Sequence, residues 1–268
     1  MTDLITVWQR STVAELSWTT PSGPSGIPVV PLMWRDSPCV ALPYSMAGTA
    51  GELRGRTVAF SVSAEDAGGR SAVVGTGPVE VVEDLDGSAF VEHLVEQEAI
   101  KHPPTRLRAD SLIARRENWW WVPRLLVSLT GIEEQHALRP RTRARDALLV
   151  RDRAGRPEVE VVTAEAWSDR GDVTLWSRGG TPLEGEGEPA FVFAHQYSPD
   201  FERWERWSRR GSLSGDTLLV TGSEGGPTGD SPSGPLAPYG LLERLGNHRS
   251  LARACRTAIA RAESRRNT

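Results

Sequence analysis

Histidines, hydroxyl side chains and arginines are the residues of this chain whose types and spacing could support chemistry. His195 falls in a stretch that predicts a strand, where an imidazole could ligate haem iron or act as a general acid. A partly buried polar residue without a chemical role is the alternative. His93 and Glu96 share one face of a predicted helix, but their motif has no second copy, so we expect no metal site. The remaining histidines have charged or proline neighbours that indicate surface positions: His102, His136 and His248.

Several classes of reaction are disfavoured by what the chain lacks. Lys101 is the single lysine among 31 basic residues, so Schiff-base chemistry would depend on it alone. The sequence contains no Walker lysine motif, no dinucleotide-binding glycine motif after a strand, and no nucleophile elbow. Cys39 and Cys255 are too few for a disulfide framework or a four-cysteine zinc site, and we interpret both as small core residues. No catalytic residue follows from these patterns.

Length and composition favour a folded protein with a substantial core. The chain has 268 residues, of which 38% are hydrophobic, and this size allows one large domain or two smaller ones. No apolar run reaches the ~18 residues of a membrane span, and the first residues do not resemble a signal peptide. We therefore expect a cytoplasmic protein with no membrane partner. A formal net charge of −4 gives no reason to expect nucleic acid as a partner.

The first half of the chain reads mainly as strands that would have to position these side chains. Period-two alternation and β-prone composition predict strands over residues 12–19, 27–34, 39–44, 57–63, 71–82 and 118–129. Glycine and proline predict turns over 21–26 and at Gly68-Gly69. Pro28 and Pro31 place the second strand at a sheet edge or a bulge. A helix is expected from Ser88 to just before Pro103.

The second half of the chain predicts another β-rich unit and a closing helix. We expect strands over residues 147–150, 158–167, 173–177, 191–197 and 217–221, and helices over 199–210 and 239–266. The arginine-rich segment 131–145 reads as a linker, with an anion-facing surface as the alternative. Residues 222–238 predict a flexible loop. Ser37–Ser45 and Glu188–Ser198 share a proline, an apolar strand and Tyr-Ser, which suggests a diverged repeat.

Residues 8 to 130 resemble the split β-barrel proteins related to pyridoxamine 5′-phosphate oxidase, including flavin-reductase-like and F420-binding relatives. The resemblance is carried by these segments: Val13-Ala-Glu-Leu-Ser-Trp18, Ile27-Pro-Val-Val-Pro-Leu-Met-Trp34, Ala41-Leu-Pro-Tyr-Ser45, Thr57-Val-Ala-Phe-Ser61, Gly75-Thr-Gly-Pro-Val-Glu-Val-Val82 and Trp119-Trp-Trp-Val-Pro-Arg124. It implies a split β-barrel over residues 1–135. With the strands predicted for the second half, we expect a mainly β fold with α (α+β), in which a second β-rich domain spans residues 146–268 as a candidate repeat of the first.

The resemblance also implies a site for a flavin or deazaflavin. The flat ring would lie on the strand backbone of Val29, Val30, Pro31 and Leu32. The phosphate would meet hydroxyls and cations of the following loop: Tyr44, Ser45, Thr49, Arg54 and Arg56. This chain departs from the family pattern because the loop has no cation before Arg54. Trp120, within the triplet Trp119–Trp121, would form a wall against the ligand, or the triplet would instead fill the barrel and a domain or dimer contact.

Two functions remain open on the sequence. The first is an FMN- or F420-dependent oxidoreductase acting on a small organic substrate. The alternative is a non-enzymatic split barrel that binds haem or another ligand and has lost flavin binding. Split barrels of this family usually dimerise with the cofactor at the subunit interface. We therefore expect either a homodimer or a pseudo-dimer in which the second domain supplies the partner surface within one chain.

Overall fold

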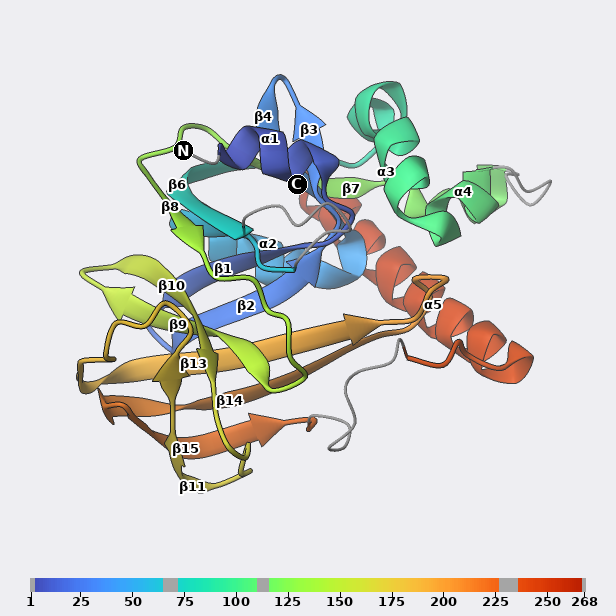
Figure 1. Ribbon diagram of the computed structural model, residues 1–268. Coiled ribbons are helices and arrows are strands. Elements are labelled where there is room, and N and C mark those ends of the chain that lie inside the picture. The colour runs from blue at the N-terminus through green and yellow to red at the C-terminus, as the bar shows by residue number, and fades with distance from the viewer. Residues whose placement is uncertain (1–2, 65–71, 110–115, 227–235, 267–268) are drawn as a thin grey trace.

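Two antiparallel sheets, stacked one above the other, make up most of the fold (Figure 1). The computed structural model describes residues 3–64, 72–109, 116–226 and 236–266, and the two sheets are those found within these ranges. A long C-terminal helix, α5 (Leu241–Arg266), runs from the outer edge of the molecule back to the first sheet. The predicted fold class, mainly β with α and built on a split barrel, is confirmed.

The first sheet is a curled half-barrel whose curvature comes from one long strand. Its strands run in the order β2-β1-β5-β6-β7-β4-β3, and β8 pairs with the first half of β6. Their bounds are β1 Ala14–Thr20, β2 Gly23–Val29, β3 Leu32–Trp34, β4 Ser37–Pro43, β5 Thr57–Val62, β6 Ala72–Asp84, β7 Arg124–Leu129 and β8 Glu134–Leu138. Because β6 pairs with β5 up to Pro78 and with β7 from Val79 onward, the sheet bends around its middle.

Short helices close the ends of this half-barrel. They are α1 Leu4–Arg10, a 3-10 turn at Tyr44–Met46, α2 Ala47–Leu53, a π-helical turn at Phe90–Leu94, α3 Val95–Lys101, α4 Pro103–Ala109 and a 3-10 segment at Arg116–Trp121. From α1, the Trp8 ring is fully buried, lies 5.0 Å from the Phe60 ring and donates to the carbonyl of Leu32. An indole therefore already occupies the centre of the first core.

The second sheet has the strand order β11-β15-β14-β13-β9-β10-β12. Its bounds are β9 Asp146–Arg153, β10 Arg156–Thr163, β11 Gly171–Thr174, β12 Trp176–Ser177, β13 Gly185–Tyr197, β14 Trp204–Gly215 and β15 Thr217–Glu224. Six neighbouring strands of each sheet can be aligned by their order across the sheet. The run β2-β1-β5-β6-β7-β4 in the first sheet then corresponds to the run β10-β9-β13-β14-β15-β11 in the second. The two sheets thus share one order of neighbours over these strands.

The sheets meet through close backbone packing and one buried polar cluster. A Cβ atom at Gly26 of β2 would lie 2.4 Å from the Phe193 ring of β13, so this position needs glycine. Beside it, Glu15 of β1 accepts hydrogen bonds from Ser61 and Ser63 and lies 2.9 Å from Nε2 of His195. Arg141, in the connector between the sheets, reaches both Glu15 and His195. The cluster joins both sheets and the connector at a single buried point.

In this cluster the pKa values of Glu15 and His195 are both lowered, but for different reasons. Burial opposes ionisation of Glu15, but the hydrogen bond and charge of His195 and the charge of Arg141 lower the pKa of the carboxyl below its ordinary value. Burial and the adjacent Arg141 charge lower the pKa of His195, and Glu15 only partly opposes that shift. Both shifts mean that the folded protein resists taking up protons here.

Most predicted strands are present, and three expectations are corrected by local chemistry. The predicted strand 27–34 is interrupted at Val30-Pro31, where Lys101 donates to the Pro31 carbonyl at 2.7 Å. Burial lowers the pKa of this lone lysine to about 8. The predicted turn over 21–26 is tighter, since β2 already begins at Gly23. The stretch expected to open a strand at residue 118 begins instead in a 3-10 segment, and β7 starts at Arg124.

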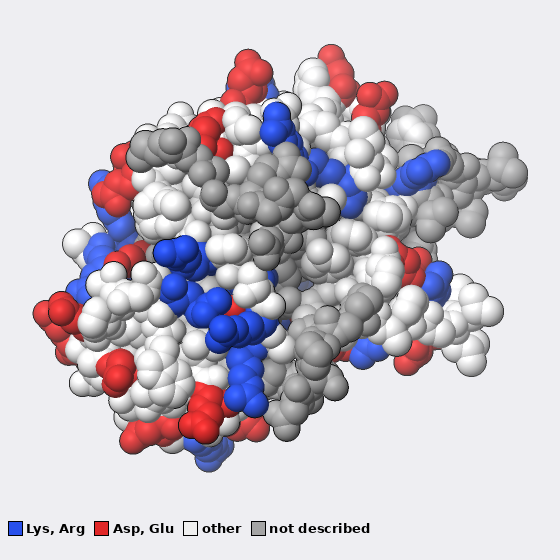
Figure 2. Space-filling view, viewed as in Figure 1, with Lys and Arg blue, Asp and Glu red and all other residues white. Residues whose placement is uncertain are grey.

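The predicted helix over 199–210 is wrong. Ser198 and Asp200 hold a turn through their side chains, Phe201 has a left-handed φ of 57°, and β14 begins at Trp204. The linker over 131–145 contains β8, and Arg139, Arg143 and Arg145 within it are exposed. Figure 2 shows a group of basic side chains on the face seen in that view.

The proposed repeat is also aligned differently from the sequence match. That match aligns β4 with β13, whereas the order of strands in the two sheets aligns β4 with β11. The Gly68-Gly69 turn and residues 227–235 of the predicted loop lie outside the described residues. Within the described residues, no helix combines the length and apolar character that crossing a bilayer requires.

Candidate functional site

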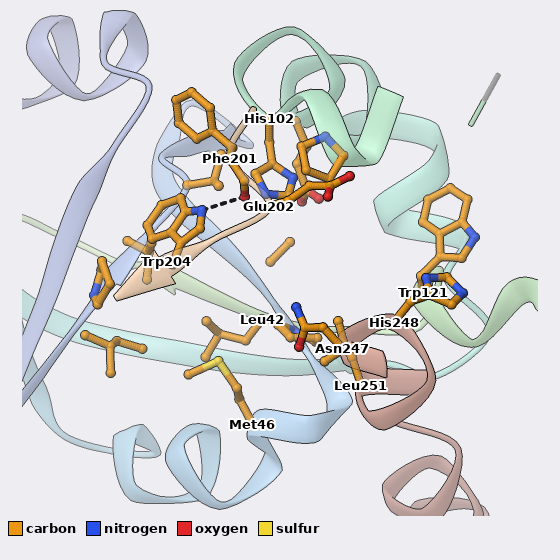
Figure 3. Close-up of a pocket in the computed structure, with 18 of the residues that line it drawn as sticks. Leu42, Met46, His102, Trp121, Phe201, Glu202, Trp204, Asn247, His248 and Leu251 are labelled. Atoms are coloured by element: carbon orange, nitrogen blue, oxygen red, sulfur yellow. Dashed lines mark hydrogen bonds between the residues drawn. The ribbon is translucent and has the colours of Figure 1, made fainter. Parts of the chain in front are cut away.

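A cavity of about 960 Å³ lies between the two sheets and beneath the N-terminal part of α5. The first sheet contributes β2 and β4, the second sheet contributes the turn before β14 and the start of that strand, and α5 forms a further wall. Figure 3 shows Phe201, Glu202 and Trp204 on one side with His102, and Asn247, His248 and Leu251 of α5 on another. The volume of the cavity is within the range of small-molecule sites.

Apolar side chains form the floor and two of the walls. Leu42 and Met46 lie at the floor in Figure 3, and the backbone segment from Ile27 to Val30 continues this surface. Trp120 and Trp121 line the end nearest α5, where the Trp120 ring meets the His248 ring edge-on at 5.2 Å. Such a surface suits a flat, largely apolar molecule, because planar rings gain most from burial against apolar and aromatic walls.

Aromatic rings extend from the cavity toward the buried polar cluster. The Trp204 indole donates to the carbonyl of Phe201, a bond drawn in Figure 3, and so is fixed against the turn. The His102 ring lies 6.2 Å from the Phe201 ring and 6.4 Å from the Trp204 ring. On its other side, Trp204 stacks with His195 at 6.4 Å and an interplanar angle of 17°. This side of the cavity is therefore built from interlocked rings.

One histidine of the cavity is held by a buried hydrogen-bonded chain. His102 Nδ1 lies 3.0 Å from the hydroxyl of Thr105, and that hydroxyl donates to Glu98 at 2.5 Å. Arg124 also donates to Glu98, at 3.2 Å. Since the hydroxyl has one proton and gives it to the carboxylate, its oxygen must accept from Nδ1–H. His102 therefore donates from Nδ1, and its neutral form is the Nδ1–H tautomer.

The charged groups of the cavity are largely paired with each other. Arg124 and Glu98 form a buried ion pair, and the Arg124 guanidinium also lies 4.3 Å over the Phe90 ring. Among the described atoms, Arg124 Nε is buried without a hydrogen-bond partner. At the cavity edge, Arg244 pairs with Asp200 at 2.6 Å and with Glu202 at 3.0 Å. Positive charge is present, but most of it is already neutralised.

The structure brings together some of the sequence-predicted site residues and separates others. Four line the cavity: Val29, Val30, Thr49 and Trp120. Six are not among its described lining residues: Pro31, Leu32, Tyr44, Ser45, Arg54 and Arg56. Arg54 pairs instead with Glu83 and with the carbonyl of Val81, and Arg56 donates to the carbonyl of Glu52. Tyr44 is buried, and burial raises the pKa of its hydroxyl. The predicted loop therefore does not bring its two arginines to the cavity.

The histidines of the site lie only partly where the sequence predicted. His102 and His248 both line the cavity; His248 is exposed, as its neighbours indicated, whereas His102 is half-buried. His195, the strand histidine, is buried in the polar cluster and is not among the described lining residues. His93 is exposed near Glu92. One signal in the sequence was available for His102: it follows Glu98 by four residues at the end of a predicted helix, so the two side chains fall on one face there.

Comparisons with known proteins give weak likenesses. No protein-family model matches the chain, and no curated protein matches it. HutZ, a haem storage protein from Vibrio cholerae, has 13% identity and a TM-score of 0.34, over 50% of this chain and 91% of that one. A conserved hypothetical protein from Mycobacterium tuberculosis has 13% identity and a TM-score of 0.32, over 51% and 84%.

A third solved structure spans nearly the whole chain. A haem-binding protein from Mycobacterium smegmatis has 12% identity and a TM-score of 0.33, with 96% of this chain and 99% of that one covered. At these scores no property of the three structures is transferred to this chain.

Proposed function

We propose that this protein binds a planar tetrapyrrole of the haem class in the cavity between its two sheets, as a binding protein and not as a flavin-dependent oxidoreductase. The observation that carries the proposal is the fixed tautomer of His102. A metal-ligating histidine characteristically donates its second ring N–H to an anchored acceptor, which orients the ring and sets the tautomer. Here Thr105 and Glu98 provide that support, inside an apolar and aromatic cavity.

The residues present fit a haem better than a phosphorylated flavin. His102 would hold the iron through its imidazole, and Leu42, Met46 and Trp120 would pack against the macrocycle. A flavin phosphate would need an unpaired cation, and Arg54 and Arg56 lie elsewhere. When bound, the iron would supply ligand-exchange or redox chemistry; the protein holds, orients and partly desolvates it.

The shared strand order supports a second part of the proposal. The cavity is lined from both sheets, so the second sheet supplies the surface that a partner subunit would supply in a dimer. We propose that the chain acts as an intramolecular pseudo-dimer, with residues 1–135 and 146–268 as its two halves. A small-molecule ligand then needs no second chain to complete its site.

Haemin titration tests the proposed function. The purified protein is titrated with haemin and, in parallel, with FMN and F420, and binding is followed by visible absorption and by the shift in melting temperature, because a ligand of the native state must raise stability. We expect a Soret shift and stabilisation with haemin alone. His102→Ala should weaken binding and change the Soret spectrum, whereas His136→Ala, at an exposed strand position, should not. Equal haemin affinity in both variants, or stabilisation by FMN alone, would contradict the proposal.

A further inference from the structure

The first eleven residues of α5 form a cavity wall that is poorly anchored to the rest of the protein. Within the helix, the buried residues are Ala252, Cys255 and Ala262, and all of them follow this segment. By contrast, Leu241, Leu242 and Leu245 are 80%, 84% and 53% exposed. The helix is thus packed from residue 252 onward, while residues 241–251 project along the cavity. Segments with few buried apolar contacts open locally at low cost.

Two ion pairs to the opposite wall hold this segment in place. Arg244 Nη2 lies 2.6 Å from Asp200 and Arg244 Nε lies 3.0 Å from Glu202, so one guanidinium joins α5 to the turn between β13 and β14. The same nitrogen Nε also donates to the carbonyl of Tyr239. Because Glu202 and Arg244 both line the cavity, this contact closes its edge. Partly exposed ion pairs are weak and easily exchanged, which suits a contact that must break repeatedly.

A glycine lies within the same segment. Gly246 is inside α5, follows the cavity-lining Leu245, and has no atom within 4 Å of the position that a Cβ would take. Packing therefore does not require glycine here. A glycine inside a helix favours local unfolding because the unfolded segment gains backbone freedom.

We propose that residues 241–251 are a gate through which the ligand enters and leaves the cavity, with the Arg244 ion pairs as its latch and Gly246 as its flexible point. The identity of the ligand rests on the proposed function, whereas the opening of the gate is a property of the ligand-free protein. The residues from Ala252 onward stay docked on the first half of the molecule while the turns before them open. The turn carrying Asp200 and Glu202 is the fixed side of the latch.

Amide hydrogen exchange on the apo protein tests the gate without any ligand. In the wild type, residues 241–251 should exchange faster than residues 252–262. Arg244→Gln should raise the exchange rate of the first segment about fivefold, and Gly246→Ala should lower it by a similar factor, since each change alters the opening equilibrium by about 1 kcal/mol. Arg249→Gln, an exposed position on the same segment, is the matched control and should change little. Equal exchange of the two segments in every variant would overturn the proposal.

Stopped-flow haemin binding then separates the gate from the proposed function. If entry needs an open gate, Arg244→Gln should raise both the association and the dissociation rate, and Gly246→Ala should lower both, by about the same factor as in exchange. Haemin binding with rates identical in all variants would refute the gate and leave the proposed function intact. The expected exchange pattern with no haemin binding would refute the proposed function and leave the gate intact.

Discussion

Removing the hydroxyl of Thr105 is the sharpest test of how the site is built. Thr105→Val keeps the shape and β-branching of a side chain that is fully buried, and deletes one oxygen. That oxygen accepts from His102 at 3.0 Å and donates to Glu98 at 2.5 Å, so the substitution removes two buried hydrogen bonds, one of them to a carboxylate. Glu98 keeps Arg124 as a partner, while Nδ1 of His102 loses the contact that fixes its tautomer.

The expected cost follows from these two contacts. A hydrogen bond to a charged group contributes about 1.5–3 kcal/mol and a neutral one about 1 kcal/mol, so the free energy of unfolding should fall by about 2–4 kcal/mol. Haemin affinity should fall further, by about 10- to 100-fold, because support of a ligating imidazole has effects of that size. Thr130→Val is the matched control. Its hydroxyl also donates a hydrogen bond, to the carbonyl of Pro78, but the residue is exposed, and a loss below about 1 kcal/mol is expected.

Urea unfolding and haemin titration of the wild type, Thr105→Val, Thr130→Val and His102→Ala decide the question. The reasoning requires Thr105→Val to lie between the wild type and His102→Ala in haemin affinity. If Thr105→Val binds haemin as tightly as the wild type while His102→Ala does not, the hydroxyl does not set the tautomer. If neither variant loses affinity, His102 is not the iron ligand.

Three further predictions concern the joint between the two sheets. The pKa of His195 lies below its unfolded value of 6.5, so the unfolded chain binds this proton more strongly, and the stability from this group is complete above pH 6.5 and falls as the pH is lowered. Urea midpoints at pH 7.5 and 5.5 should therefore differ less in His195→Gln than in the wild type. Equal differences in the two proteins would refute this prediction. Gly26→Ala should destabilise by about 2 kcal/mol or more, since its Cβ would lie 2.4 Å from Phe193, whereas Gly51→Ala, in α2 with nothing within 4 Å, should be neutral or stabilising in thermal unfolding. Light scattering should give a monomer of 29.3 kDa, and a stable dimer would contradict the pseudo-dimer.

The sequence predicted the strands of this protein better than its site. Alternation predicted the strand over Thr57–Val62, although the structure buries both of its faces. The turn from Ser198 to Arg203 was not predicted, because Phe201, Trp204 and Trp207 also satisfy helical spacing. In the structure, hydrogen bonds involving the side chains of Ser198 and Asp200 form a turn in place of the helix. Local hydrogen bonds of this kind compete with helix formation and are not visible in hydrophobic periodicity.

The cavity could be predicted only in part. The resemblance correctly placed four residues at the cavity: Val29, Val30, Thr49 and Trp120. His248 and Leu251 reach it only because α5 returns across the molecule from the far end of the chain, a contact that no local pattern encodes. The pairing of Arg54 with Glu83 was equally hidden, since the two residues lie 29 positions apart. Long-range packing decided which charges faced the cavity.

The shared strand order also bears on how such a protein can diversify. In a symmetric homodimer, every substitution appears twice, so a change that improves one binding face alters its counterpart at the same time. In a single chain with two sheets of matching order, each half mutates alone. Each half can then change its own side of the cavity without altering the other, so a single chain with this strand order can hold an asymmetric ligand.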